Sequence, residues 1–312
     1  MKPDISLIFP FYNEADNLIY LMPDLNLFFS GIPEIKAEVI FVDDGSSDDS
    51  VDILRKGEHE FYTARIIKLS RNSGSHAAVR AGIFHARGEW ISILAADLQD
   101  PLQLIIEMHK QCLNCYDIVV AQRRTVKTDL TTRILSRCNA YLMRKYAIKD
   151  YPKKGADVVM FNSKVRGILN NNIEANSNFM LQILSLGFKK TFIEYDKISR
   201  EYGKSKWTFA KKIKLFIDSF VAFSFFPIRM VSVVGIVMFL IGLLWTSYIV
   251  IRTLLFHDLA QGWPTTISIL MLGFGITNIA LGVIAEYLWR TLDSARKRPV
   301  FIVDEIIELN ET

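Results

Sequence analysis

Short apolar stretches alternate with amphipathic stretches over about the first 200 residues of the chain. Five apolar stretches are typical of buried strands: Ile5–Pro10, Ala37–Asp43, Thr63–Leu69, Trp90–Ala95 and Asp117–Gln122. Four stretches between them have the spacing of helices: Ala15–Phe29, Ser50–Glu58, Gly74–Ala86 and Leu102–Cys115. This alternation predicts an α/β fold, with a mostly parallel sheet covered by helices on both faces.

Two much longer apolar stretches follow, and neither contains a charged residue. They are Met230–Ile251, of 22 residues, and Leu259–Ala285, of 27 residues. At a rise of about 1.5 Å per residue, either one can cross a hydrocarbon core about 30 Å thick. We predict a transmembrane hairpin over residues 229–290, with spans at about 230–251 and 263–286. The alternative is a pair of buried helices in a soluble core.

Basic residues flank this hairpin on both outer sides. Lys211, Lys212, Lys214 and Arg229 precede it, and Arg290, Arg296, Lys297 and Arg298 follow it. The short connector Arg252–Asp258 offers only one arginine. The positive-inside rule therefore predicts a multi-pass protein of the cytoplasmic membrane, with the N-terminal domain and both termini in the cytoplasm. The start of the chain has only a brief apolar run, Ile5–Phe9, which is too short for a signal peptide.

The segment before the hairpin combines aromatic and basic residues. Phe209, Ile213, Phe216 and Phe220 recur at helical spacing beside three lysines. This pattern predicts an amphipathic helix in the membrane interface, and an ordinary packing helix is the alternative. The expected organisation is a catalytic domain at 1–206, this interfacial region at 207–228, the hairpin at 229–290 and a cytoplasmic tail at 291–312.

The composition excludes several classes of protein. Half of the residues are hydrophobic and the mean hydropathy is +0.21, which excludes a disordered or collagen-like chain. The net charge of +4 is too small to indicate a nucleic-acid partner. Cys112 and Cys115 form a C-x-x-C pair, but there is no second pair. With three cysteines in the whole chain, we expect structural thiols in a reducing compartment.

Acidic and amide side chains follow three of the predicted strands, within Phe9–Glu14, Val42–Asp48 and Ala96–Pro101. Parallel strands bring these ends to one edge of the sheet, where α/β proteins bind ligands. Carboxylate and amide oxygens suit a divalent cation that bridges a diphosphate, and Asp44 suits a uracil or ribose. Alternatively, Asp48 and Asp100 cap the helices that follow them.

Five motifs give the chain a family resemblance: P-x-Y-N-E at Pro10–Glu14, V-D-D-G-S at Val42–Ser46, S-R-N-x-G at Ser70–Gly74, A-D-L-Q-D-P at Ala96–Pro101 and G-K-S-K-W at Gly203–Trp207. In this order, and followed by a hairpin and then Arg298-Pro299 and Ile302-Val303, they resemble family 2 glycosyltransferases of the Rossmann-like GT-A fold. The similar branch loads sugars onto polyisoprenyl phosphates, and includes dolichol-phosphate mannose synthases and bactoprenol glucosyltransferases.

The resemblance implies a site with three parts. The nucleotide-sugar would contact Pro10, Tyr12, Asn13, Glu14, Asp43, Asp44, Arg71, Gly74 and Asp97. Mg²⁺ or Mn²⁺ would be bound by Asp97 and Gln99, and the catalytic residues would be Asp97 and Asp157. The acceptor phosphate would contact Arg123, Arg124, Arg133, Ser136, Lys204 and Lys206.

The chain departs from the family pattern at two positions. The D-x-D motif would begin at residue 95, which is Ala95, so that Asp97 is the remaining acid. Many relatives place an acid directly after the glycine that corresponds to Gly155, whereas here Asp157 comes two residues after it. These changes leave open a catalytically impaired family member that binds the lipid carrier or assists assembly.

The function implied is inverting transfer of one sugar from a nucleotide-sugar, UDP before GDP, to undecaprenyl phosphate in the cell envelope. The acceptor phosphate is already anionic near neutral pH and needs little general-base help. Glycines in the spans could also pack against a second copy of the chain, or only against each other: Gly235, Gly242, Gly273, Gly275 and Gly282.

Overall fold

The structure is a computed structural model, and it describes residues 2–124, 140–146, 148, 151–152, 155–174, 178–198, 224, 226–256 and 262–310. The chain divides into two compact units, Met1–Ala222 with Arg298–Thr312, and Phe223–Lys297. Arg133, Ser136, Lys204, Lys206 and most of the predicted interfacial segment lie outside the described residues.

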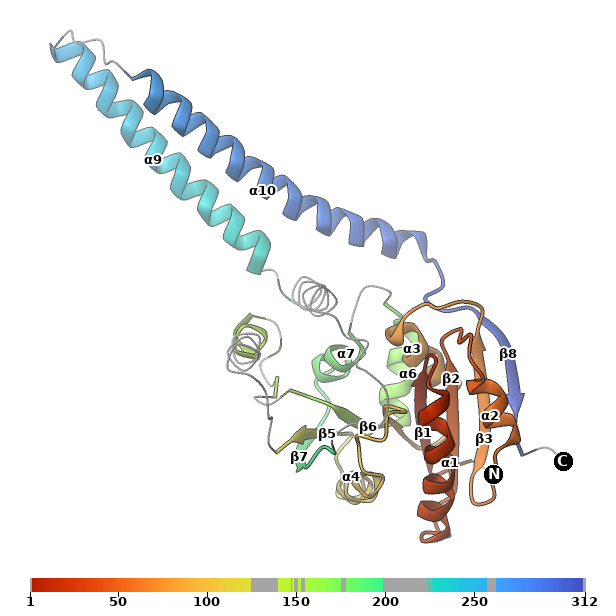
Figure 1. The fold of residues 1–312 in the computed structure, drawn as a ribbon. Coiled ribbons are helices and arrows are strands. Elements are labelled where there is room, and N and C mark those ends of the chain that lie inside the picture. Colours follow the sequence, from red (N-terminus) through yellow and green to blue (C-terminus); the bar gives the residue numbers. More distant parts are fainter. Residues whose placement is uncertain are drawn as a thin grey trace. The chain divides into compact units, whose positions relative to one another are not determined.

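The first unit is built on an eight-stranded sheet in the order β7-β5-β6-β4-β1-β2-β3-β8 (Figure 1). The strands are β1 (Ile5–Phe11), β2 (Ala37–Asp43), β3 (Thr63–Leu69), β4 (Trp90–Ile93), β5 (Ile118–Arg123), β6 (Val158–Asn162), β7 (Lys190–Tyr195) and β8 (Val303–Glu308). Strands β3, β2, β1 and β4 run parallel, as do β5 and β7, whereas β6 and β8 are antiparallel to their neighbours. The predicted α/β class with a mostly parallel sheet is confirmed.

The four predicted helices are confirmed as α1 (Ala15–Ser30), α2 (Ser50–Lys56), α3 (Ser75–His85) and α4 (Gln103–Leu113). Two further helices, α6 (Ser163–Asn171) and α7 (Phe179–Ser185), were not predicted. Alternate residues of the central strands pack on opposite faces. Leu7 and Phe9 join a core with α1 and α4, while Ile8 packs against Gly82 of α3. Burial on both faces explains why β1 and β2 are apolar at nearly every position.

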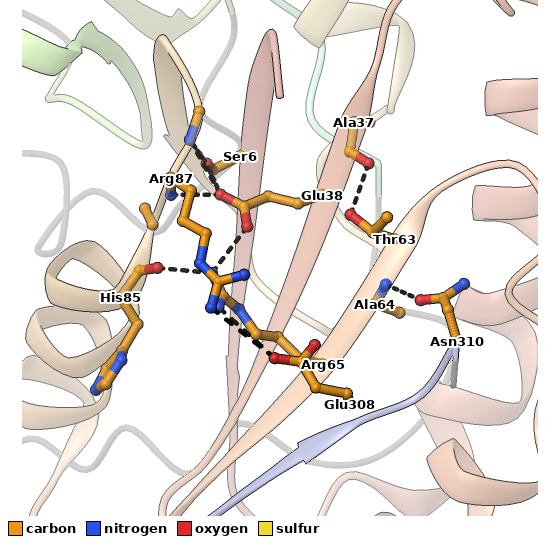
Figure 2. Close-up of polar contacts among 12 residues, drawn as sticks. Ser6, Ala37, Glu38, Thr63, Ala64, Arg65, His85, Arg87, Glu308 and Asn310 are labelled. Atoms are coloured by element: carbon orange, nitrogen blue, oxygen red, sulfur yellow. Dashed lines mark hydrogen bonds and ion pairs between the residues drawn. The ribbon is translucent and has the colours of Figure 1, made fainter. Parts of the chain in front are cut away.

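The C-terminal segment returns to the sheet as the edge strand β8. It pairs antiparallel with β3, with Ile66 opposite Ile307. Beyond β8, the Asn310 side chain donates from Nδ2 to the carbonyl oxygens of His59 and Tyr62, at 2.7 and 2.9 Å. Asn310 Oδ1 also accepts from the N–H of Ala64 (Figure 2). The segment predicted as a tail therefore contains a strand that covers one edge of the sheet.

A buried ion pair joins the amino-terminal ends of the central strands, opposite the edge where the acidic motifs lie. Arg65 Nη2 is 2.8 Å from Glu38 Oε2, and both side chains are about 95% buried. Ser6 and the N–H of Gly88 also donate to Glu38, while Arg65 donates to the carbonyl of His85 (Figure 2). Because every partner is a fixed element of the fold, this cluster secures strand positions on the side away from the candidate site.

The second unit consists of two long helices, α9 (Phe226–Phe256) and α10 (Trp263–Arg296), which lie side by side as a hairpin (Figure 1). Within them, Ile228–Trp245 and Leu272–Arg296 are long and apolar enough to cross a membrane. No residue of either window is buried among those described. Exposed leucine, isoleucine and valine on both helices require an apolar environment or partner.

Candidate active site

The carboxyl ends of β1, β2 and β4 meet at one edge of the sheet. Phe11 pairs with Asp43, and Ile8 pairs with Ile93, so that the three following loops start side by side. The Asp44 N–H donates to the Phe11 carbonyl at 2.9 Å and ties the first two loops together. The sequence placed its acidic motifs on these loops because parallel strands share one polarity, and the structure brings them together as expected.

The loop after β1 is joined to the loop after β2 by reciprocal hydrogen bonds. The Asn13 N–H donates to Ser46 Oγ at 2.9 Å, and Ser47 N–H donates back to Asn13 Oδ1 at 2.8 Å. Asn13 itself has φ of 50°, in the left-handed region that asparagine tolerates better than most residues. Tyr12 beside it is 36% exposed and offers a ring at the surface.

Asp43 and Asp44 are both almost fully buried, but they differ in their partners. Asp43 Oδ1 accepts from the N–H of Ser46 at 2.8 Å, while Asp43 Oδ2 is buried without a hydrogen-bond partner among the described residues. Asp44 accepts from the N–H groups of Ser73 and Gly74, at 2.7 and 2.9 Å. Burial raises the pKa of Asp44, and these two N–H groups lower that pKa.

Asp44 therefore shapes the Ser70–Gly74 motif in addition to any contact with a ligand. Gly45 allows the two loops to approach, because a Cβ there would lie 2.7 Å from the Asn72 nitrogen, and its φ is +73°. Gly74 has φ of +92° with open space around it, immediately before α3 begins at Ser75. Arg71 is exposed at this edge.

The loop after β4 carries Ala95, Asp97 and Gln99. Ala95 is exposed and Asp97 and Gln99 are half-buried. The Gln99 N–H donates to Asp97 Oδ1 at 3.4 Å, so both side chains belong to one short turn. Leu98 between them has φ of 58°.

Among the residues that the structure describes, no three His, Cys, Asp or Glu side chains gather as a site for a cation. One carboxylate and one amide are nevertheless enough for Mg²⁺ or Mn²⁺ that takes its remaining ligands from a substrate diphosphate and water. The donor set at Asp97 and Gln99 fits an ion of that kind, and does not fit an ion held by protein alone.

Asp100 does not cap the helix after it. The residue before α4 is Leu102, and no side chain caps that helix. Instead, Asp100 Oδ1 accepts from Tyr195 Oη at 2.5 Å and lies 3.3 Å from Lys197 Nζ. Asp48 likewise joins two elements, since it accepts from the N–H groups of Ala15 and Ser50, both at 3.2 Å.

Arg123 and Asp157 form a bidentate ion pair near Asp100 of the loop after β4. Arg123 Nε and Nη2 donate to the two oxygens of Asp157 at 2.7 and 2.6 Å. The side chains are 37% and 15% exposed, so the arginine keeps an accessible surface. Arg124 pairs with Asp196 at 3.0 Å in a more exposed position. Arg123, Arg124 and Asp157 were predicted as site residues from the sequence. Asp196 was not predicted, and neither was the pairing of Arg123 with Asp157.

Tyr195 and Lys197 were missed by the sequence analysis, which predicted no strand at β7. Both cysteines of the C-x-x-C pair have free thiols: Cys115 is exposed and Cys112 is buried, and burial raises the pKa of Cys112 to about 12. His76 lies in the first turn of α3, where its Nε2 is 2.9 Å from the Glu174 carbonyl oxygen.

Comparison with known proteins decides the family. Residues 6–174, which cover more than half of the chain, match the glycosyl transferase family 2 profile. This chain belongs to glycosyl transferase family 2. The matched residues contain the loops after β1, β2 and β4 together with the Arg123–Asp157 pair. The resemblance drawn from the motifs is thereby confirmed.

Several relatives match this family 2 chain over nearly its whole length. A Synechocystis protein named as an uncharacterized glycosyltransferase is 31% identical, over 98% of this chain and 96% of its own. A Photorhabdus laumondii undecaprenyl-phosphate 4-deoxy-4-formamido-L-arabinose transferase is 29% identical, over 99% and 95%. An Escherichia coli prophage bactoprenol glucosyl transferase homolog is 28% identical, over 97% and 99%.

Among solved structures, the fold is similar to mannosyltransferase PcManGT from Pyrobaculum calidifontis in complex with GDP-Man and Mn²⁺. The TM-score is 0.46 at 19% identity, and the match covers 69% of this chain and 61% of that chain.

Proposed function

We propose that this family 2 glycosyltransferase transfers one sugar from a nucleotide-sugar, preferably a UDP-sugar, to undecaprenyl phosphate with inversion at the anomeric carbon. The observation that carries the proposal is the full-length match to relatives named for undecaprenyl phosphate or bactoprenol. That match includes the two helices that are apolar enough to cross a membrane. A lipid-bound acceptor gives such a hairpin a purpose, because it keeps the enzyme at the surface where the acceptor lies.

The donor half of the site is the set of loops after β1, β2 and β4. Asp43, Asp44 and the Asn13 turn are held by backbone and side-chain hydrogen bonds, so their oxygens are in place before a ligand arrives. Such preorganisation lowers the cost of ordering a bound nucleotide. Asp43 Oδ2, buried without a described partner, is the acceptor atom that a base or ribose donor would satisfy.

Asp97 and Gln99 would hold Mg²⁺ or Mn²⁺ against the donor diphosphate. The ion, when bound, neutralises charge on the departing nucleotide diphosphate. The contribution of this chain is the positioning of one carboxylate and one amide on a turn whose backbone is itself hydrogen-bonded. The single carboxylate predicts modest affinity for the free ion and tighter binding together with the nucleotide.

The acceptor half of the site centres on Arg123. A guanidinium suits a phosphate because it donates two parallel hydrogen bonds, and Asp157 holds this one in a fixed plane. This pairing favours a positioning role for Asp157 over a role as general base. A lipid phosphate with a second pKa of about 6 is already a dianion at neutral pH and needs no strong base.

The membrane arrangement proposed is a cytoplasmic catalytic unit anchored by the α9–α10 hairpin in the inner membrane. Arg229 lies in the first turn of α9, and Arg290 and Arg296 lie in the last two turns of α10. Both outer ends of the hairpin are thus basic, which favours the cytoplasmic side.

The test is transfer by the purified full-length chain in nanodiscs. Undecaprenyl phosphate is combined with a panel of labelled UDP- and GDP-sugars, each with Mn²⁺, with Mg²⁺ or with EDTA. The expected result is one labelled lipid, formed from one donor and lost with EDTA. Nucleotide binding without transfer from any donor would instead support a catalytically impaired carrier-binding protein, for which Ala95 is the reason.

A further inference from the structure

The Asp97–Asp100 loop has a backbone conformation that its own sequence does not favour. Leu98 has φ of 58°, in the left-handed region, where a leucine Cβ crowds the following carbonyl. Such a conformation persists only where neighbouring groups hold it. The neighbours that do so identify residues on which the geometry of Asp97 and Gln99 depends.

The end of β7 holds this loop at two successive residues. The Ile198 N–H donates to the Gln99 carbonyl at 2.9 Å. One residue further, Asp100 Oδ1 accepts from Tyr195 Oη at 2.5 Å and lies 3.3 Å from Lys197 Nζ. We call Tyr195, Lys197 and Ile198 the β7 clamp. One of its three contacts is made by backbone and two by side chains, so the side-chain part can be removed by substitution.

Asp100 is committed to the clamp. The Asp100 side chain is 4% exposed, and it does not cap α4. A buried carboxylate requires hydrogen-bond donors, and here both donors named come from the β7 end. Removing the Tyr195 hydroxyl therefore weakens the contact that holds the loop on its α4 side.

The clamp also adjoins the acceptor half of the site. In the parallel β5–β7 pair, Arg123 lies opposite Tyr195. Arg123 is the residue that pairs with Asp157. One strand end thus contacts the loop of the metal ligands and neighbours the arginine proposed for the acceptor phosphate.

We propose that Asp100, Tyr195 and Lys197 are positioning residues, which hold Asp97 and Gln99 in the geometry that binds the metal–diphosphate group of the donor. We assign to none of these three residues a contact with the reacting atoms. The inference rests on the proposed function, and it adds to that function a dependence of donor binding on the β7 end.

The test uses the full-length chain with Tyr195→Phe, which removes one hydroxyl and keeps the ring. Binding of UDP and of GDP, each with Mn²⁺, is measured by calorimetry, and donor and acceptor KM are measured in the transfer assay. We expect metal–nucleotide binding to weaken about tenfold, as for loss of a hydrogen bond to a charged group, with donor KM rising in parallel. Acceptor KM stays within about twofold of the unaltered value, because Arg123 retains Asp157.

Tyr62→Phe is the matched control. Tyr62 is a buried tyrosine whose hydroxyl is 3.0 Å from His59 Nδ1, in the core outside the loops of the site. It removes a buried hydroxyl contact without touching the clamp, so it should leave nucleotide binding unchanged. In an Asp100→Ala background, Tyr195→Phe should have no further effect on binding.

Hydrogen exchange of residues 97–100 separates this inference from the proposed function. We expect faster exchange in this loop of Tyr195→Phe and unchanged exchange in β2. If the chain without substitutions binds no nucleotide and transfers no sugar, the proposed function fails. If hydrogen exchange of residues 97–100 is the same in Tyr195→Phe as in the chain without substitutions, the clamp itself is overturned. Faster exchange with undiminished metal–nucleotide binding overturns the positioning role, since Tyr195 would then only stabilise the fold.

Discussion

At the scale of single residues, the Arg123–Asp157 pair shows how a charged side chain can be oriented and still accessible. The Arg123 guanidinium donates from Nε and Nη2 to the Asp157 carboxylate, and about a third of the arginine side chain remains exposed. A lysine at this position carries the same charge but cannot make two parallel hydrogen bonds from a fixed plane. The proposed phosphate contact of Arg123 therefore depends on guanidinium geometry as well as on charge.

Arg123→Lys should raise the KM for the lipid phosphate about tenfold, the effect of losing a bidentate contact, with donor KM little changed. The measurement is initial rate against acceptor concentration at saturating donor. Arg55→Lys is the matched control, since Arg55 makes an exposed ion pair with Glu305 outside the site. Equal acceptor KM for Arg123→Lys and the unaltered chain would remove Arg123 from the acceptor site.

Ala95 is the position where the family pattern has a second acid, and its exposure leaves room for one. Ala95→Asp should lower the Mn²⁺ concentration for half-maximal activity several-fold, to about tenfold, because the ion gains a charged ligand. The residue is exposed, so the substitution should not change the melting temperature. An unchanged Mn²⁺ requirement would place residue 95 outside the metal site.

His59 should make folding sensitive to acid. Its Nε2 is 2.9 Å from the Leu54 carbonyl, which only a donor satisfies, so Nδ1 accepts from the Tyr62 hydroxyl at 3.0 Å. Burial lowers the pKa of His59 in the folded chain below its unfolded value of about 6.5. As the pH falls below about 6.5, the unfolded chain therefore binds a proton at His59 more readily than the folded chain does. The free energy of unfolding therefore falls as pH drops through that region.

Thermal unfolding from pH 7.5 to pH 5.5 measures this effect against His59→Gln, which cannot titrate. The stability advantage of the unaltered chain should shrink as the pH falls. An advantage that is constant across this range would show that His59 does not contribute to the acid sensitivity.

At the scale of elements, Asn310 joins the chain just after β8 to the start of β3. Asn310→Ala removes three hydrogen bonds to the start of β3 and the turn before it. We expect a loss of about 2 kcal/mol of unfolding free energy, because buried backbone groups lose their partner. Hydrogen exchange should accelerate in β8 and β3 and not in β5.

Asn172→Ala, which removes one exposed hydrogen bond to the Ile168 carbonyl, is the control for this substitution. If Asn310→Ala were as stable as Asn172→Ala, the pairing of β8 with β3 would not need the asparagine.

The sequence predicted the elements that follow one simple rule and missed those that do not. The five strands could be predicted because a parallel core strand is an uninterrupted apolar run bounded by turns. The four helices could be predicted because their apolar residues recur at helical spacing. β7 and β8 lie at the two edges of the sheet, and most of their residues are exposed or half-buried, so they lack such a run. β6 is buried throughout and apolar except for Asn162, and its antiparallel place between β4 and β5 depends on contacts distant in sequence.

The same limit applies to the candidate site. The acids after β1, β2 and β4 were predictable because strand polarity places them at one edge. Arg123 and Asp157 were predicted separately, but their pairing arises from the place of β6 beside β5. Tyr195 and Lys197 could not be predicted without β7. The run of β-branched and aromatic residues in KTFIEY at Lys190–Tyr195 is the signal that would have indicated a strand there.

At the scale of the whole molecule, the proposal requires the catalytic unit and the C-terminal segment to share one side of the membrane. β8, which follows α10, pairs with β3 of the catalytic unit, so a hairpin that spans the membrane as proposed has both of its ends on one side. The basic residues at both outer ends favour the cytoplasm as that side.

Cysteine labelling in intact cells tests this arrangement. In a background whose three native cysteines are replaced by serine, a cysteine at Gln261, between α9 and α10 in sequence, should react with an impermeant maleimide added on the outer side of the cytoplasmic membrane. A cysteine at Asp304 in β8 should react only after lysis. Labelling of both from outside, or of neither, would contradict a hairpin with a cytoplasmic catalytic unit.

The proposed reaction joins one sugar to a polyprenyl phosphate at the site formed by the loops of Asp97 and Arg123. Mass spectrometry of undecaprenyl phosphate after incubation with the purified chain, Mn²⁺ and the donor panel detects the product itself. We expect a lipid phosphate heavier by a single sugar residue, absent with EDTA and absent with Asp97→Ala. An unchanged lipid mass with every donor, or an equal yield from Asp97→Ala, would contradict it.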